Sequence, residues 1–545
     1  MFLKKMQEKP RVDDGYGWRD AAALSFLTGL LLVIYWPVLN AYFMADDPYL
    51  LQATIEHGPW RHFVDPSLRL PETPLVLMPW LHVSFFMDYR LFGIEPLGYY
   101  AHQLGALWLV VMLLYAVWRD VVAPLACTVA LGWLLLAAPA AQAAQFLMTR
   151  HYLEGLCLAL LAVLCQRRAQ EQSSLGWAVL AAGWYGLAMT AKEIFVPMPL
   201  LFFRMRPKRL LVPHALCIIA YFFWRAAMLG PAHLFTGYGD TEPMDSHAIL
   251  GLPHRFLELM GWRSNGVLGM ELVLASTALA ALVKQYSSRL LFFAAAGTLL
   301  PLLPVLPIMQ PRFLLVPAVW LALGIALVVQ RAGRSIGKPW IIAAGGAILY
   351  GQAVAMHASP AWMNRDYIAQ YRLEGRFVTE DAAAGHAAIL SPIGHAYYYA
   401  GLLWLRHALL HHEGNPLVCK ESCLCAALPR RPAFQYHDGV LKAVSWPLPC
   451  PRSQHDLRVQ LTYQDQLLDW RFGPYRSGRY LVLLNHPDQG LYGFPHWLPP
   501  QGQYVFSISQ PLSMVVRYPL DGGQWAATPL LTLNPAAPAV KVNYP

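Results

Sequence analysis

Long apolar segments recur along the first two thirds of this 545-residue chain, and they constrain its fold more than any other feature. A helix needs about twenty mostly apolar residues to cross the hydrocarbon core of a bilayer. Hydrophobic residues make up 56% of the chain, and only 13% are charged, whereas about a quarter are charged in ordinary soluble domains. The sequence therefore predicts a polytopic α-helical membrane protein.

The apolar segments predict about eleven transmembrane helices within residues 1–357. Lys and Arg gather at alternate ends of these segments, which favours a cytoplasmic N-terminus and an extracytoplasmic C-terminus. The net charge of +9 is attributed to the cytoplasmic loops, so no nucleic-acid partner is predicted. The expected spans are 21–43, 99–118, 122–140, 151–166, 175–191, 194–204, 210–229, 266–284, 289–308, 313–330 and 339–357.

Two of the predicted features are unusual for a helical bundle. The segment 194–204 is short and contains two prolines, which fits a broken or partial span, whereas the alternation of basic loops favours a crossing. The first outer loop, 44–98, is long, and its stretch 75–92 is amphipathic. We expect this stretch to form a helix that lies along the membrane surface.

The character of the chain changes after residue 357, and residues 358–545 predict a soluble, extracytoplasmic α+β domain. Residues 365–380 and 395–411 favour helices, whereas 387–390 and the alternating runs from about 432 onward favour β-strands. We expect the bacterial inner membrane, with this domain in the periplasm. The topology fits an endoplasmic reticulum membrane with a lumenal domain equally well.

Four of the eight cysteines fall in the soluble domain, which favours one or two disulfides in an oxidising compartment. They are Cys419, Cys423, Cys425 and Cys450. The alternative is a zinc site that also uses nearby histidines, although the cysteine spacing is unusual for one. These histidines are His407, His411 and His412.

Ionisable residues recur at the outer ends of the predicted spans. Asp46 and Asp47 follow the first span, and Pro48 is expected to end the helix there. Each residue alone fits a structural role. However, cations at the extracytoplasmic ends of four spans contradict the usual preference of Lys and Arg for the cytoplasmic side. We therefore expect them to line one cavity, where an acid acts as a base and cations hold a phosphate. The further residues are Arg150, Lys192, Arg225 and Arg312, with His151, Glu154 and Glu193 as accessory groups.

The position of this predicted cavity points to a lipid phosphate as substrate, because the cavity would open on the membrane. A carboxylate could take the proton of an attacking hydroxyl while the cations neutralise the departing phosphate. The sequence contains no Rossmann glycine fingerprint and no Walker loop, which disfavours a nucleotide-sugar or ATP-driven mechanism. The pattern therefore predicts glycosyl transfer from a lipid-phosphate sugar.

Short patches of residues 20–330 resemble the GT-C superfamily of integral-membrane glycosyltransferases, which includes protein O-mannosyltransferases, aminoarabinose transferases and a TMTC-like branch. The patches are Asp46-Asp47-Pro48-Tyr49, Lys192-Glu193 before a proline-containing span, Arg225 with Leu229-Gly230, and Pro311-Arg312-Phe313-Leu314. The soluble domain departs from the TMTC-type arrangement, because it shows no tetratricopeptide helices.

The resemblance implies a polyprenyl-phosphate-linked hexose or pentose as donor and an inverting transfer to a glycan, lipid or protein acceptor. It implies that an acid of the first outer loop is the base or a metal ligand. Asp47 is favoured as the base with Asp46 as helper, although the sequence alone does not decide between them. Some members of the superfamily use a divalent cation, for which His151, Glu154 and Glu193 could complete a site.

Two other functions fit the same residues. One is a transporter or flippase for lipid-linked glycans, which would use the cationic cavity without chemistry; the absence of duplicated halves counts against it. The other is a non-catalytic envelope-assembly protein in which a transferase-like fold carries the exported domain. An acid-to-amide change at Asp47 distinguishes the transferase from both.

Overall fold

The computed structural model describes 17–68, 76–202, 207–234, 256, 260, 276–277, 280, 283–284, 310–335, 338–358, 365–391, 393–420, 431–445, 457–464, 467–475, 478–486, 491–505, 511–520, 525–534 and 540–544. The chain divides into two compact units. The helical unit comprises 1–41 and 53–365, and the mixed unit comprises 42–52 and 366–545. The division therefore places Asp46 and Asp47 in the same unit as the C-terminal domain.

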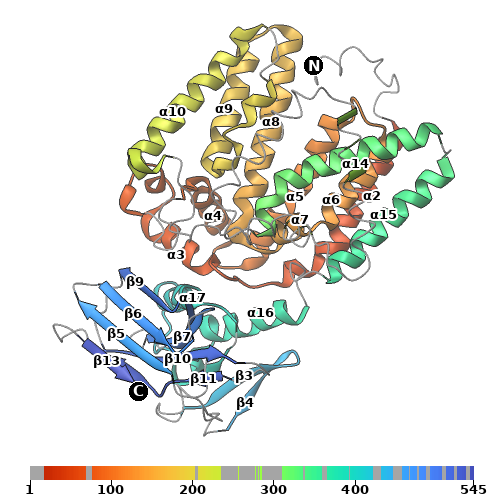
Figure 1. The fold of residues 1–545 in the computed structure, drawn as a ribbon. Coiled ribbons are helices and arrows are strands. Elements are labelled where there is room, and N and C mark those ends of the chain that lie inside the picture. Colours follow the sequence, from red (N-terminus) through yellow and green to blue (C-terminus); the bar gives the residue numbers. More distant parts are fainter. Residues whose placement is uncertain are drawn as a thin grey trace. The chain divides into compact units, whose positions relative to one another are not determined.

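The helical unit is built from apolar helices, several of which run side by side (Figure 1). Its α-helices are α2 (Trp18–Tyr35), α4 (Pro79–Phe92), α5 (Pro96–Trp118), α6 (Pro124–Leu136), α7 (Ala138–Gln145), α8 (Arg150–Gln172), α9 (Leu175–Ala191), α10 (Val212–Leu229), α14 (Leu315–Ser335) and α15 (Lys338–Ala358). α3 (Asp47–His57) lies across the division between the units.

Short 3₁₀ helices connect these elements. They are η1 (Trp36–Asn40), η2 (Arg61–Phe63), η3 (Pro66–Leu68), η4 (Leu147–Thr149), η5 (Glu193–Phe195), η6 (Met198–Phe202), η7 (Lys208–Leu211), η8 (Pro231–His233) and η10 (Pro311–Leu314).

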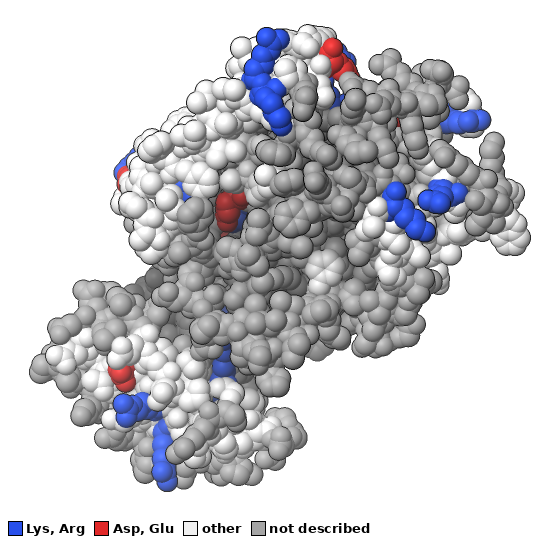
Figure 2. All heavy atoms as spheres, turned by 45° about the horizontal axis from the view of Figure 1, so that its top comes forward, with Lys and Arg blue, Asp and Glu red and all other residues white. Residues whose placement is uncertain are grey.

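Five described helices are long and apolar enough to cross a membrane, which supports the predicted membrane protein. They are Trp18–Asn40, Pro96–Trp118, Leu147–Gln172, Lys208–Leu229 and Pro311–Ala332. α6 and α7 together would be a sixth span or a re-entrant pair, because the chain bends by 59° between them. Figure 2 shows the described Lys, Arg, Asp and Glu side chains of this face as a few separate groups.

The structure does not confirm the predicted count of about eleven spans. Residues 194–204 form 3₁₀ turns through Phe202 instead of a crossing helix. Pro197 and Pro199 lack the N–H donors that an α-helix would need there. α9 is a shorter apolar helix of 17 residues. The predicted spans 266–284 and 289–308 and most of the predicted loop 230–265 lie outside the described residues.

Pro48 has a different role from the expected one. The first span already ends before it, in η1, and Pro48 occupies the first turn of α3. Proline is favoured in this position because the first helical residues need no N–H donor. The predicted amphipathic helix of the first outer loop is α4, which likewise begins with a proline, Pro79. Pro48 therefore starts a helix where the sequence predicted a helix end.

The mixed unit confirms the predicted β-rich C-terminal domain. Its helices are α16 (Arg365–Glu380) and α17 (Ala396–Ala408), and η11 (Ala382–His386) is a 3₁₀ turn. Its strands are β1 (Ala388–Leu390), β2 (Leu417–Cys419), β3 (Ala433–His437), β4 (Val440–Val444), β5 (Arg458–Gln464), β6 (Leu467–Gly473), β7 (Tyr480–His486), β8 (Leu491–Leu498), β9 (Gln501–Val505), β10 (Leu512–Pro519), β11 (Trp525–Ala527), β12 (Leu531–Leu533) and β13 (Val540–Tyr544).

Two sheets organise the mixed unit. One has the strand order β11-β10-β7-β8-β2-β1-β3-β4, with β12 paired to β10, and the other has the order β13-β5-β6-β9. β1 is parallel to both β2 and β3, and α17 connects β1 to β2. Alternate residues of β5, β6, β7 and β10, such as Leu461, Trp470 and Val516, form one buried apolar core. This core follows the period-two pattern from which the strands were predicted.

Candidate functional site

The predicted site residues are distributed over both units. Asp46 and Asp47 belong to the mixed unit, whereas the predicted phosphate-binding cations belong to the helical unit. The expected convergence of the acids with these cations stays a prediction. Within each unit, the hydrogen bonds and ion pairs show which of these side chains already have protein partners and which remain accessible to a ligand.

Arg150 is a buried cation with several protein partners. Its guanidinium is fully buried, with 0% side-chain exposure, and forms an ion pair with Asp88 of α4. It also donates to the Ser84 hydroxyl and to the Tyr99 carbonyl, each at 3.1 Å. Its carbon Cζ lies 4.8 Å from the centre of the Phe85 ring. Arg150 thus joins α4, α5 and α8, and few of its donors remain for a phosphate.

Glu154 lies one turn further along α8 and is also engaged. Its two carboxylate oxygens accept from the Trp80 indole at 2.7 Å and from the Ser84 hydroxyl at 2.6 Å. Its carboxylate therefore links α4 to α8. Across the part of the chain that the structure describes, no group of three or more His, Cys, Asp or Glu residues is arranged to hold a metal ion.

Two other predicted cations act on one buried ring. The positive charges of Lys192, at the end of α9, and Arg312, in η10, both act on the imidazole of His151 at the start of α8. Lys192 Nζ lies 3.3 Å from Glu193 Oε1 and 5.8 Å from the centre of the Tyr152 ring. We call Lys192, His151 and Arg312 the cation cluster.

Aromatic and polar side chains hold the cation cluster in place. The rings of His151 and Tyr152 lie 4.4 Å apart, and the Tyr152 ring lies 6.0 Å from that of Phe313. The backbone N–H of Arg312 donates to Gln142 Oε1 at 2.7 Å. Lys192 is 1% exposed, whereas Arg312 is only half-buried. The cluster therefore combines a buried ammonium with a guanidinium that a ligand can approach.

Arg225 lies on α10 and has a partly separate environment. Its Nε donates to the Leu234 carbonyl at 2.9 Å, and its side chain is buried. The charges of Arg225 and Glu193 both act on Tyr221. Glu193 also lies next to Lys192, at 3.3 Å, and this is the one ion pair described for Glu193.

The two adjacent acids have different environments in the mixed unit. Asp47 is 0% exposed, and its Oδ2 accepts the backbone N–H of Met44 at 2.9 Å. Its negative charge also stands at the start of α3, where the helix dipole favours it. Asp46 keeps 36% of its side-chain exposure, and its Oδ1 lies 2.9 Å from His395 Nε2. Asp46 is therefore the acid that a substrate can reach.

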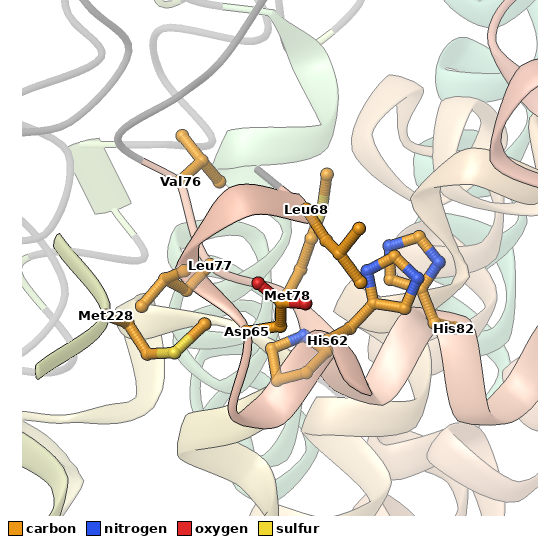
Figure 3. A pocket seen from close by; sticks show the side chains of 9 residues that line it. His62, Asp65, Leu68, Val76, Leu77, Met78, His82 and Met228 are labelled. Carbon is orange, nitrogen blue, oxygen red and sulfur yellow. The ribbon is translucent and has the colours of Figure 1, made fainter. Parts of the chain in front are cut away.

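A cavity in the helical unit contains polar residues that the sequence patterns did not single out. It is small and half-open, and the empty space of about 330 Å³ around it includes open solvent at its mouth. Figure 3 shows the imidazole rings of His62 and His82 lying over one another at one end and Leu77 and Met228 at the other. The ring centres are 3.5 Å apart and the planes are nearly parallel, at 4°.

Burial sets the protonation of this histidine pair. It lowers the pKa of His62 to about 4 and that of His82 well below its usual value. His82 Nδ1 lies 2.8 Å from the Thr54 hydroxyl. Two neutral rings can stack closely, whereas two imidazolium rings would repel each other. At neutral pH the pair is therefore an uncharged wall of the cavity.

The mixed unit has a second buried polar group, at the ends of β1 and β2. Glu374 accepts from Gln370 at 2.7 Å and from the Tyr399 hydroxyl at 3.1 Å, and Ser391 also donates to it. Burial raises the pKa of Glu374 and lowers that of Lys420 to about 8. This network ties α16 and α17 to the sheet.

The cysteine predictions fall partly within the described residues. Cys419, at the end of β2, is disulfide-bonded, while Cys423, Cys425 and Cys450 lie outside the described residues. Of the alternative zinc ligands, His407 Nε2 lies 2.5 Å from the Asn415 amide oxygen and its Nδ1 lies 2.9 Å from the His412 carbonyl. Both nitrogens of His407 thus have hydrogen-bond partners within the domain.

The sequence was also compared with known proteins. It matches none of the protein families with which it was compared, and no curated protein is significantly similar to it. The functional argument therefore depends on the residues themselves.

Proposed function

We propose that this chain is a membrane glycosyltransferase that moves a sugar from a polyprenyl-phosphate donor to an extracytoplasmic acceptor. The observation that carries the proposal is the cation cluster, in which the charges of Lys192 and Arg312 both act on His151 within an apolar helical unit. Ionisable groups among membrane-spanning helices are expensive and are usually retained for function. Ammonium and guanidinium groups are the side chains that bind phosphate most strongly.

The cation cluster suits the phosphate of a lipid better than that of a soluble nucleotide. Lys192 lies at the end of an apolar helix and its present partner, Glu193, is 23% exposed. A phosphate that approaches Lys192 and Arg312 would replace the partial neutralisation by Glu193 with a full ion pair. Arg150 is left out of this phosphate site because its guanidinium already bonds to Asp88, Ser84 and Tyr99.

Asp46 is the proposed base. It takes the proton of the acceptor hydroxyl while that oxygen attacks the anomeric carbon of the sugar and the lipid phosphate leaves. Asp47 supports the turn instead, because its buried carboxylate accepts the Met44 N–H. This assignment reverses the order favoured by the sequence, and the reversal follows from the exposure of the two side chains. We propose the periplasmic side of a bacterial inner membrane as the place of the reaction.

The test uses membranes that contain the full chain, supplied with a panel of undecaprenyl-phosphate hexoses and pentoses carrying a radiolabelled sugar. We expect label to pass from the lipid to an acceptor, and Lys192→Met to weaken donor binding at least tenfold. Arg209→Met is the control, because Arg209 is an exposed cation on the predicted inner side.

The same vesicles distinguish the transporter alternative. A flippase would bring the labelled sugar to the opposite leaflet, where periodate oxidises it, and would leave it attached to the lipid. Translocation without transfer to any acceptor in the panel would overturn the transferase proposal. Neither translocation nor transfer, with the protein folded, would favour the envelope-assembly alternative.

A further inference from the structure

The exposed acid of the mixed unit has an imidazole as its neighbour. Asp46 Oδ1 and His395 Nε2 are 2.9 Å apart, and their side chains keep 36% and 41% of their exposure. Both residues belong to the same compact unit. The pair is therefore fixed by contacts within the unit and is still open to a ligand.

The hydrogen bonds of His395 define where its proton lies. His395 is the N-cap residue of α17, and its Nδ1 accepts the backbone N–H of Tyr398 at 3.3 Å. A ring nitrogen that accepts a hydrogen bond carries no proton, so the proton of the neutral ring is on Nε2. Nε2 then donates to Asp46 Oδ1. One imidazole thus caps the helix and orients the carboxylate.

Both members of the pair follow residues with left-handed backbone. Ala45 has a φ of 48°, and Gly394 has a φ of 72°. A non-glycine residue pays about 1–2 kcal/mol for this conformation. A Cβ on Gly394 would also come within 2.5 Å of the Tyr398 ring. Two tight turns therefore aim Asp46 and His395 at each other.

The first turn of α3 also packs directly on α17. A Cβ on Gly401 would lie 2.5 Å from the Tyr49 nitrogen and 2.6 Å from the Pro48 carbonyl carbon, so only glycine permits this approach. The rings of Tyr49 and Tyr397 meet edge to face, with 5.3 Å between their centres. The helix that His395 caps is therefore the helix that supports the Asp46 turn.

We propose that His395 is a positioning residue for Asp46, so that the C-terminal domain supplies part of the catalytic centre. This inference rests on the proposed function. During transfer, the acceptor oxygen bonds to the anomeric carbon as the bond from that carbon to the phosphate oxygen breaks. The acceptor's proton goes to the free oxygen of Asp46, and the lipid phosphate leaves with the bonding electron pair. His395 keeps its hydrogen bonds with Tyr398 and Asp46 and holds the carboxylate in one orientation throughout.

The activity test compares His395→Asn with His395→Ala in the full-length protein. Asparagine is a good N-cap residue, so it should preserve α17, but its shorter side chain loses the contact with Asp46. We expect a fall in kcat of about 10–100-fold, with unchanged donor KM and melting temperature. Added imidazole should restore part of the activity of His395→Ala. His407→Asn, on the same helix and away from Asp46, is the control.

A second measurement does not depend on turnover. The full chain is labelled with ¹⁵N-histidine, and the signal that disappears in His395→Asn is assigned to His395. That signal should show a protonated Nε2 and an unprotonated Nδ1. Asp46→Asn should shift the Nε2 resonance of His395. A proton on Nδ1, an unshifted resonance, or wild-type kcat in His395→Asn would overturn the positioning role. If the wild type transfers no sugar while the ¹⁵N result holds, the proposed function fails and the Asp46–His395 contact stands.

Discussion

Arg150 and Asp46 carry opposite charges in the two units, and both were predicted from sequence as site residues, yet their surroundings differ. Arg150 is fully buried and bonded to Asp88, Ser84 and Tyr99. Asp46 keeps 36% of its side-chain exposure, and its Oδ1 lies 2.9 Å from the His395 imidazole. An ionisable residue at a predicted membrane end can therefore be either a structural cross-link or an accessible reactive group. The partners of its side chain, and not its position in the sequence, distinguish the two.

The largest effect should come from removing the structural cation. Arg150→Met removes the guanidinium beside the buried Asp88 carboxylate and leaves it only the contact with His102 Nδ1 at 2.8 Å. Loss of one partner of a buried ion pair typically costs about 3–5 kcal/mol of folding free energy. Denaturant unfolding in detergent measures this loss. Arg167→Met is the control, because Arg167 pairs with the exposed Asp120 and surface pairs contribute about 0–1 kcal/mol. A stable Arg150→Met protein that binds the donor poorly would make Arg150 a ligand residue and break the comparison.

The next effect separates the two adjacent acids. Asp47→Ala leaves the Met44 N–H without its acceptor in a buried turn, which should cost about 1–3 kcal/mol. Asp46→Ala should change the free energy of unfolding much less, because Asp46 is exposed and its contact with His395 is a surface contact. The two variants are compared in the same unfolding experiment. Equal losses of stability would remove the difference on which the choice of Asp46 rests.

A smaller effect is expected at Arg312, the half-buried member of the cation cluster. Arg312→Met should raise the donor KM about tenfold, since a charge-assisted bond to phosphate is worth about 1.5–3 kcal/mol. The melting temperature should not change, in contrast to Arg150→Met. Titration with undecaprenyl phosphate provides a direct measurement of binding. Unaltered affinity would exclude Arg312 from the phosphate site.

The last effect appears only at acidic pH and concerns the stacked histidines of the helical unit, whose burial favours the neutral rings. The folded-state pKa of His62 is lowered from 6.5 to about 4, so the unfolded chain takes up the proton first as the pH falls. The stability should therefore decrease between pH 6.5 and 4 and should not depend on this group above pH 6.5. His62→Phe should flatten the decrease in melting temperature, and His437→Phe, at an exposed site, should not. An unchanged slope in His62→Phe would contradict the assignment.

Long apolar runs and the alternation of apolar with polar residues predicted much of the fold. The spans at α2, α5, α8, α10 and α14 and the strands β1, β5 and β7 follow patterns that are local in the sequence. The segment 194–204 was wrong as a crossing helix, because its two prolines outweigh the pattern of basic loops. Local periodicity therefore predicts helices and strands well. It predicts less directly which helices cross the membrane.

The site was harder to predict because its chemistry depends on distant partners. Asp88 neutralises Arg150 from α4, and His395 meets Asp46 only because the first turn of α3 packs on α17. Neither Asp88 nor His395 lies in a motif. The left-handed Ala45 gives no sequence signal either, whereas the glycine before His395 is a weak hint of a tight turn.

The central claim is that Asp46 is the base of a sugar transfer from a polyprenyl-phosphate donor. The most direct test measures label transfer from the donor panel by membranes containing the wild type, Asp46→Asn and Asp47→Asn, with donor binding measured in parallel. We predict that Asp46→Asn lowers kcat by about 10²–10⁴-fold with donor binding intact, and that Asp47→Asn retains most of its kcat when folded. Wild-type turnover in Asp46→Asn would contradict the account.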